Sequence, residues 1–131
     1  MYPANITRAN ASARAGMLAT RTYEILVDLT GRDPDGRPLA EPEENFVTTS
    51  VIRFTSSAGL TVVDVIADEI LGASLDDEPI DTSRFDGARL SLDLSEGRHE
   101  LSITAMHRYS RSGQGLHRFV DPADGRVYLY T

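Results

Sequence analysis

The stretch LSLDLSEGRHELSITA, Leu90–Ala105, carries the clearest fold signal in the sequence. Leucines at positions 90, 92 and 94 alternate with polar residues, and Leu101, Ile103 and Ala105 alternate in the same way. A period of two is typical of β-strands with one buried face. Glu96-Gly97-Arg98 lies between the two runs and predicts a reversal of the chain. Short turns between sequential strands favour antiparallel pairing, so we expect these two strands to be neighbours.

The same alternation recurs on both sides of this stretch. Gly and Pro crowd the loop Gly31–Asn45, and Asp124-Gly125 predicts a hairpin. At the N-terminus, Asn5 is a good cap for a short surface helix. The sequence therefore predicts an all-β, mostly antiparallel, sandwich-like fold of about eight strands with a short N-terminal helix, forming a single domain over residues 1–131. Further strands are expected at Thr22–Thr30 (half-buried), Phe46–Thr55, Leu60–Ala67, Glu69–Leu75, Leu116–Val120 and Arg126–Thr131.

Charge and composition exclude several classes of function. The net charge is −7, and all 13 basic residues are arginines that form no cluster, which disfavours nucleic acid as a partner. The chain has no cysteine, and no apolar run approaches the length of a membrane span. Its first residues, MYPANITRAN, lack the pattern of a signal peptide. We expect a cytoplasmic domain without membrane contact.

Possible catalytic and metal sites are weak. None of the histidines, His99, His107 and His117, has the spacing of a zinc site. Ser112, His117 and Asp121 contain the residue types of a catalytic triad but lack a nucleophile elbow. Gly113-x-Gly115 is followed by an extended run rather than a helix, which favours a tight bend over a phosphate site. Two acidic stretches, Asp33-Pro34-Asp35-Gly36 and Asp76–Asp81, are interpreted as solvated loops.

The last hairpin is unusually aromatic. Phe119, Tyr128 and Tyr130 lie on its two arms, and Val127, Leu129 and Tyr130 make its second strand apolar on both faces. Such a strand needs a covering on both sides. It is either a central strand of the core, or it has its own domain on one side and a neighbour on the other. We favour the second interpretation and predict an interdomain interface at Gly115, His117, Arg118, Phe119, Tyr128 and Tyr130.

YSRSGQGLHRFVDPADGRVYLYT, residues Tyr109–Thr131, resembles the zinc-dependent aminopeptidase N family, in particular its actinobacterial branch. NITRANASARAGML resembles the opening helix of that family, and TYEILVDLT, TTSVIRF and FDGARLSL resemble its strands, in the same order. The resemblance implies the N-terminal β-saddle of a multidomain zinc aminopeptidase, which packs on the catalytic domain and helps to wall the active-site cleft.

The resemblance carries no catalytic or metal residue onto this chain. The His-Glu-x-x-His and Gly-x-Met-Glu-Asn motifs of the family are absent between Met1 and Thr131. The substrate-contacting glutamine of the family's N-terminal domain would follow Thr131. The expected role is therefore non-catalytic, with zinc in the parent enzyme and none here. The catalytic domain is the expected partner, and the isolated domain is expected to self-associate. Two alternatives are a free-standing β binding module and a small enzyme that uses Ser112, His117 and Asp121.

Overall fold

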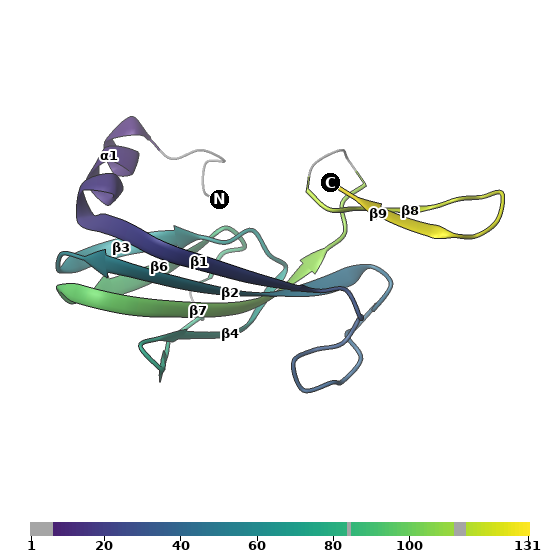
Figure 1. Ribbon diagram of the computed structural model, residues 1–131, viewed down its shortest axis with the longest axis horizontal. Helices are drawn as coiled ribbons and strands as arrows, with labels where there is room; N and C mark the ends of the chain where they lie inside the picture. Colours follow the sequence, from purple (N-terminus) through teal and green to yellow (C-terminus); the bar gives the residue numbers. More distant parts are fainter. Residues whose placement is uncertain (1–6, 84, 112–114) are drawn as a thin grey trace.

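The computed structural model describes residues 7–83, 85–111 and 115–131. Helix α1 (Arg8–Met17) is followed by the strands of an antiparallel fold (Figure 1). The prediction of an all-β domain with one short helix is confirmed. The strands are β1 (Leu18–Asp28), β2 (Asn45–Ser56), β3 (Gly59–Asp64), β4 (Glu69–Leu75), β5 (Glu78–Pro79), β6 (Arg89–Leu94), β7 (Gly97–Arg108), β8 (His117–Val120) and β9 (Val127–Tyr130).

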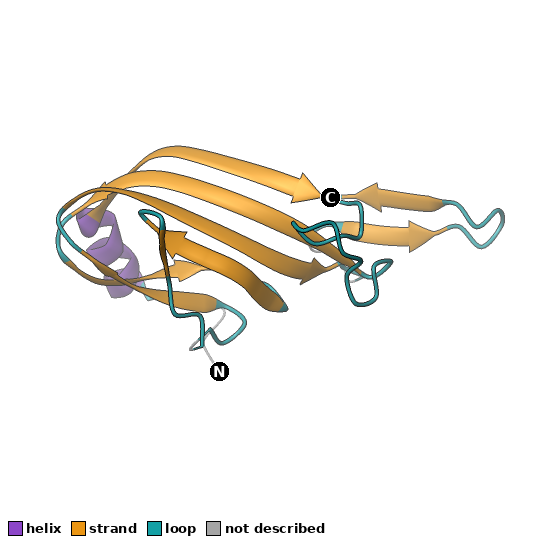
Figure 2. Cartoon of the chain, turned by 90° about the horizontal axis from the view of Figure 1, so that it is seen from below, coloured by secondary structure: helices purple, strands orange, loops and turns teal. Residues whose placement is uncertain are grey.

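Three antiparallel sheets arise from these strands. The largest has the order β1-β2-β7-β4-β5, while β3 pairs with β6 and β8 pairs with β9. The long strands of the first sheet lie side by side, and the β8–β9 hairpin extends beyond their end (Figure 2). The β3–β6 sheet packs on one face of the large sheet, because Leu90, Leu92 and Leu94 of β6 share one buried cluster with residues of β2 and β7.

The expectation that Leu90–Leu94 and Leu101–Ala105 pair side by side is wrong. Strand β7 has β2 on one edge and β4 on the other, so no edge remains for β6. The connection at Ser95–Glu96 instead takes the chain from one sheet to the other, and Gly97 begins β7 with a φ of 131°. The apolar faces of the two strands therefore meet face to face. Leu90 and Leu101 are 1% and 2% exposed, the most deeply buried of the large side chains described.

Helix α1 lies on the surface, as predicted, and none of its residues is buried. Thr7 caps it by accepting a hydrogen bond from the Asn10 N–H at 3.1 Å, whereas the predicted cap Asn5 lies outside the described residues. Arg14 fixes the helix to β3 through the Val62 carbonyl at 3.2 Å and the Asp64 carboxylate at 3.0 Å.

The prediction that Thr22–Thr30 forms a half-buried strand is correct for the strand and wrong for the burial. β1 is an edge strand, and the side chains of residues 19–27 are all exposed. Tyr23, Ile25 and Val27 do share one face, as the alternation predicts, yet they are 57%, 58% and 47% exposed. The reason is that the β3–β6 sheet covers the middle of the large sheet and leaves this edge uncovered.

His99 connects two turns at one end of the core. Its side chain is 5% exposed, with Nδ1 2.6 Å from the Asp76 carboxylate and Nε2 2.7 Å from the Ser95 carbonyl. Both partners are hydrogen-bond acceptors, so the contacts favour the protonated imidazole, in which both ring nitrogens donate. The Ser95 carbonyl and then the Asp76 carboxylate raise the pKa of His99 above 6.5. Burial raises the pKa of Asp76, but hydrogen bonds from His99 and from the Glu100 N–H outweigh this effect, so the pKa of Asp76 is lowered.

Core packing predicts a large difference between two leucines. Leu101→Ala should lower the free energy of unfolding by about 2–5 kcal/mol, because it leaves a cavity at the centre of the buried cluster. Leu60→Ala removes the same atoms from a side chain that is 80% exposed. It should change the free energy of unfolding by less than about 0.5 kcal/mol. Urea unfolding of both variants measures the difference, and equal losses would contradict the assignment of the core.

The His99 cation predicts a specific pH dependence of stability. A raised pKa in the folded state stabilises fully below the unfolded value of 6.5, and this contribution is lost as pH rises through the folded pKa. The free energy of unfolding should therefore fall as pH rises above about 6.5 through the raised pKa of His99. Urea titrations of the wild type and His99→Gln at several pH values test this. If the free energy of unfolding depends on pH in the same way in the wild type and in His99→Gln, His99 is not the source of the pH dependence.

Candidate functional site

The β8–β9 hairpin is built as its sequence predicts. Asp124-Gly125 lies in the turn, where Gly125 has a φ of 72° and its N–H donates to the Asp121 carbonyl at 2.8 Å. The Asp121 carboxylate accepts from the Ala123 N–H at 2.8 Å, and the Asp124 carboxylate accepts from the Arg126 N–H at 2.9 Å. Left-handed glycine and aspartate side chains that bond to the local backbone are typical of such turns. They fix the register of the two strands.

The register separates the hairpin side chains into two faces. His117 pairs with Tyr130 and Phe119 pairs with Tyr128, so one face is aromatic. Arg118 pairs with Leu129, and Val120 pairs with Val127, so the other face is mainly aliphatic. The exposed fractions are 49% for Phe119, 45% for Val120, 47% for Val127, 47% for Tyr128, 38% for Leu129 and 54% for Tyr130.

The expectation that the core of this domain covers one face of the hairpin is wrong. Because the hairpin extends away from the large sheet, both faces are exposed along β9 (Figure 1). Monomeric proteins rarely expose contiguous apolar patches of large area, and such patches mark interaction surfaces. We call the apolar side chains of residues 119, 120 and 127–130 the hairpin surface.

The six residues predicted for an interface differ in their exposure. Phe119, Tyr128 and Tyr130 are exposed, and Arg118 is half-buried. His117 is 5% exposed, because its ring stacks on Tyr130 with centroids 4.8 Å apart and planes 10° apart. Gly115 has a φ of 73° and forms a bend before β8, while Gly113 lies outside the described residues. His117 therefore lies beside Tyr130 on the aromatic face but contributes little accessible surface to it.

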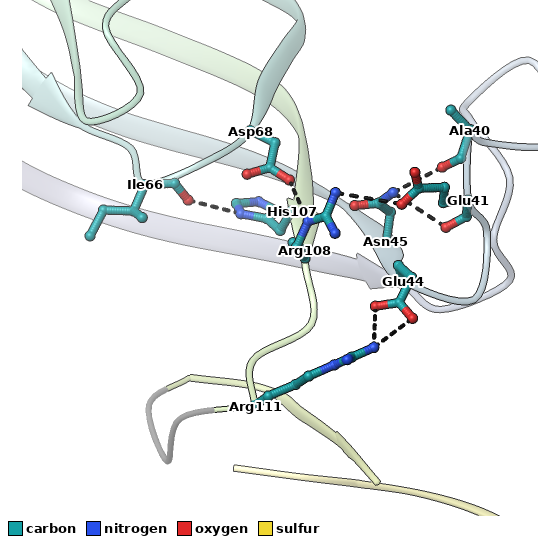
Figure 3. A network of polar contacts seen from close by, with 9 residues as sticks. All are labelled: Ala40, Glu41, Glu44, Asn45, Ile66, Asp68, His107, Arg108 and Arg111. Carbon is teal, nitrogen blue, oxygen red and sulfur yellow. Dashed lines mark hydrogen bonds and ion pairs between the residues drawn. The ribbon is translucent and has the colours of Figure 1, made fainter. Parts of the chain in front are cut away.

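Backbone contacts and one ion pair hold the base of the hairpin. The Ser110 N–H donates to the Leu116 carbonyl at 2.7 Å, and the Arg118 N–H donates to the Ser110 carbonyl at 3.4 Å. Arg111 Nη2 lies 2.7 and 2.8 Å from the two carboxylate oxygens of Glu44 (Figure 3). Glu44 also accepts from the Tyr109 N–H at its carbonyl, 2.9 Å away. The segment between β7 and the hairpin is thus tied to the residues just before β2.

Arg108 extends this polar network. Its guanidinium lies 3.5 Å from the Glu41 carboxylate and 3.6 Å from the Asp68 carboxylate, and Asn45 Nδ2 donates to the Ala40 carbonyl at 2.8 Å (Figure 3). Sequence reasoning missed this network, because nothing in the acidic loop Gly31–Asn45 indicates which arginine its glutamates meet. Through Glu44 the loop helps to position the hairpin, although the two segments are far apart in the sequence.

The candidate residues for catalysis and metal binding do not come together. His107 donates through Nδ1 to the Ile66 carbonyl at 2.9 Å and lies 2.7 Å from the Thr48 hydroxyl, and burial lowers the pKa of His107. The Asp33 carboxylate accepts from the N–H groups of Asp35 and Arg37 within its own loop. Ser112 lies outside the described residues. Residues 7–83, 85–111 and 115–131 contain no group of three or more His, Cys, Asp or Glu placed to bind a metal ion.

In the described part of the chain, no helix is long and apolar enough to cross a membrane.

Comparison with known proteins relates this chain to part of a known enzyme. No family model matches the sequence. The chain is 35% identical over 131 residues to aminopeptidase N of Streptomyces lividans. The match covers 97% of this chain but 14% of that protein. This chain is therefore related, over nearly its whole length, to a small part of an aminopeptidase N.

Proposed function

We propose that this chain is the non-catalytic N-terminal β domain of an aminopeptidase N-like zinc metallopeptidase that removes N-terminal residues from peptides. In this role it packs on the catalytic domain and helps to wall the active-site cleft. The observation that carries the proposal is the hairpin surface, whose two apolar faces are both exposed. The similarity to a small part of an aminopeptidase N supports it, because most of that protein has no counterpart in this chain.

The proposed interface follows from the chemistry of the hairpin. Phe119, Tyr128 and Tyr130 offer large apolar area together with two hydroxyl groups, a combination enriched at protein interfaces. The stacked His117 and the Arg111–Glu44 pair hold the hairpin in place, which reduces the entropy lost on docking. A partner that covers both faces would bury the hairpin as a central element.

The described residues do not fit a zinc site, since they contain no suitable group of ligands. Under the proposal, zinc binds in the catalytic domain of the longer protein, where it polarises the peptide carbonyl and activates water. The part played by this chain is positional. Strand β9 ends at Tyr130, and in the proposed parent the next residues reach the active site.

The proposal predicts what the source gene encodes after Thr131. We expect a glutamine codon at once, and further downstream a Gly-x-Met-Glu-Asn and a His-Glu-x-x-His segment. The 131-residue chain alone, supplied with zinc, should release no nitroaniline from an aminoacyl nitroanilide, whereas the longer protein should. A stop codon after Thr131 would contradict the proposal. Turnover by the short chain that is lost in His117→Ala would favour the small-enzyme alternative.

The hairpin surface predicts a context-dependent effect of one substitution. Phe119→Ala should change the free energy of unfolding of the 131-residue chain by less than about 1 kcal/mol, because the ring is 49% exposed. In the longer protein, where the ring would be buried, the loss should be about 3–5 kcal/mol. Leu60→Ala is the control, because Leu60 is exposed and lies on β3, outside the hairpin surface. Equal small losses for Phe119→Ala in both proteins would favour a free-standing binding module.

A further inference from the structure

Strand β1 exposes a second apolar surface, separate from the hairpin. Tyr23, Ile25 and Val27 pair with Ile52, Ser50 and Thr48 of β2, which pair in turn with Leu101, Ile103 and Ala105 of β7. Residues directly opposite in a sheet share one face. The β1 side chains therefore lie on the same face of the large sheet as the buried cluster. We call Tyr23, Ile25 and Val27 the β1 row.

Burial falls steeply across this face of the sheet. Leu101 and Ile103 of β7 are 2% and 4% exposed, whereas Ile25, two strands away, is 58% exposed. The β3–β6 sheet ends short of β1 and leaves an apolar cavity of about 150 Å³ between the two layers. Leu18 and Tyr23 line it from the large sheet and Val62 and Val63 line it from β3, while the paired Arg14 and Asp64 lie at its margin. The open side of the sandwich thus lies along the β1 edge.

The edge of β1 is also suited to pair with another strand. It carries unpaired backbone N–H and C=O groups, because β2 is its only partner among the described strands. Natural edge strands are usually protected by lysine, proline, bulges or inward-pointing charges. Residues 22–29 contain neither lysine nor proline, and the irregularity in register lies earlier, between Thr20 and Thr22. Glu24 lies on the opposite face, where Arg53 is 3.4 Å away, so it does not protect the β1 row.

We propose that the β1 edge accepts an extended segment from the remainder of the same aminopeptidase N-like polypeptide. This segment adds a strand to the large sheet and covers the β1 row, which closes the open side of the sandwich. Side chains that face the β1 row should be β-branched or aromatic and uncharged, because Tyr23, Ile25 and Val27 carry no charge. The inference rests on the proposed function, since it takes the longer protein as the source of the strand.

Two observations favour this occupant over a second copy of the chain. In Figure 1, α1 and the β8–β9 hairpin lie at opposite ends of β1 and on the side of its free edge, so a body that docks on the hairpin also faces β1. Each copy of the chain carries a net charge of −7, which weakens the self-association expected of its exposed apolar surfaces. The chain corresponds to 14% of its aminopeptidase N relative, so such a protein has ample length to supply a strand.

Amide hydrogen exchange in the 131-residue chain and in the longer protein from the same gene tests the inference. In the short chain, the alternate amides of residues 22–28 that do not bond to β2 should exchange rapidly. In the longer protein these amides should exchange at least about 100-fold more slowly, because the added strand gives each N–H group a hydrogen-bond acceptor. A globular surface laid on the sheet face would not protect these edge amides in alternation.

A matched pair of variants locates the contact. Ile25→Lys places a charge on the β1 row and should restore rapid edge exchange in the longer protein while leaving the short chain unchanged, because Ile25 is exposed there. Leu26→Lys is the control, because Leu26 is 66% exposed and points to the opposite face. It should leave the protection of β1 in place. If the β1 amides exchange at the same rate in the two variants of the longer protein, the added segment does not cover the β1 row.

Failure of this inference and failure of the proposed function give different results. Protection of Phe119 and Tyr128 amides without protection of β1 overturns the added strand and leaves the hairpin interface standing. Absence of protection at both places, or a gene that stops at Thr131, overturns both. Protection of β1 in the short chain that rises with its concentration identifies a second copy as the occupant and overturns the inference.

Discussion

The structure depends on the face-to-face packing of β6 on β7. Leucines 90, 92 and 94 come from one sheet, and Leu101, Ile103 and Ala105 come from the other, so a short connection joins the two layers of the core. This packing is forced by the sheet itself, because both edges of β7 are occupied by β2 and β4. Apolar residues that cannot meet across an edge can still meet across an interface between sheets. His99 holds the connection in place through Ser95 and Asp76.

The second sheet is too small to cover the first. With β3 and β6 alone, it buries the middle of the large sheet and leaves β1 exposed, although β1 has the same alternating pattern as the buried strands. The hairpin is exposed for a different reason, because it extends away from both sheets. Two apolar surfaces of separate origin therefore remain, and hydrophobic burial favours covering both of them. Under the proposed function, the remainder of the aminopeptidase N-like protein supplies that covering.

Polar residues decide where the hairpin lies. Arg111 Nη2 contacts both carboxylate oxygens of Glu44, and Arg108 lies between Glu41 and Asp68, so the acidic loop before β2 and the segment after β7 are held together. Exposed ion pairs of this kind stabilise weakly one by one. Their contribution is to position, because several contacts together restrict where the segment before the hairpin can lie.

The sequence alone determined the strands other than the two-residue β5, the hairpin turn and the position of a short N-terminal surface helix, since these depend on local periodicity, on Asp124-Gly125 and on the residues at the start of the helix. It also placed the aromatic residues of β9 on a strand with two apolar faces. Only the tertiary structure decided that β6 packs on β7 instead of pairing with it, and that Tyr23, Ile25 and Val27 are exposed. The Arg111–Glu44 contact likewise joins residues far apart in the chain. Alternation specifies which side chains share a face, but what covers that face depends on how many strands the opposite sheet contains.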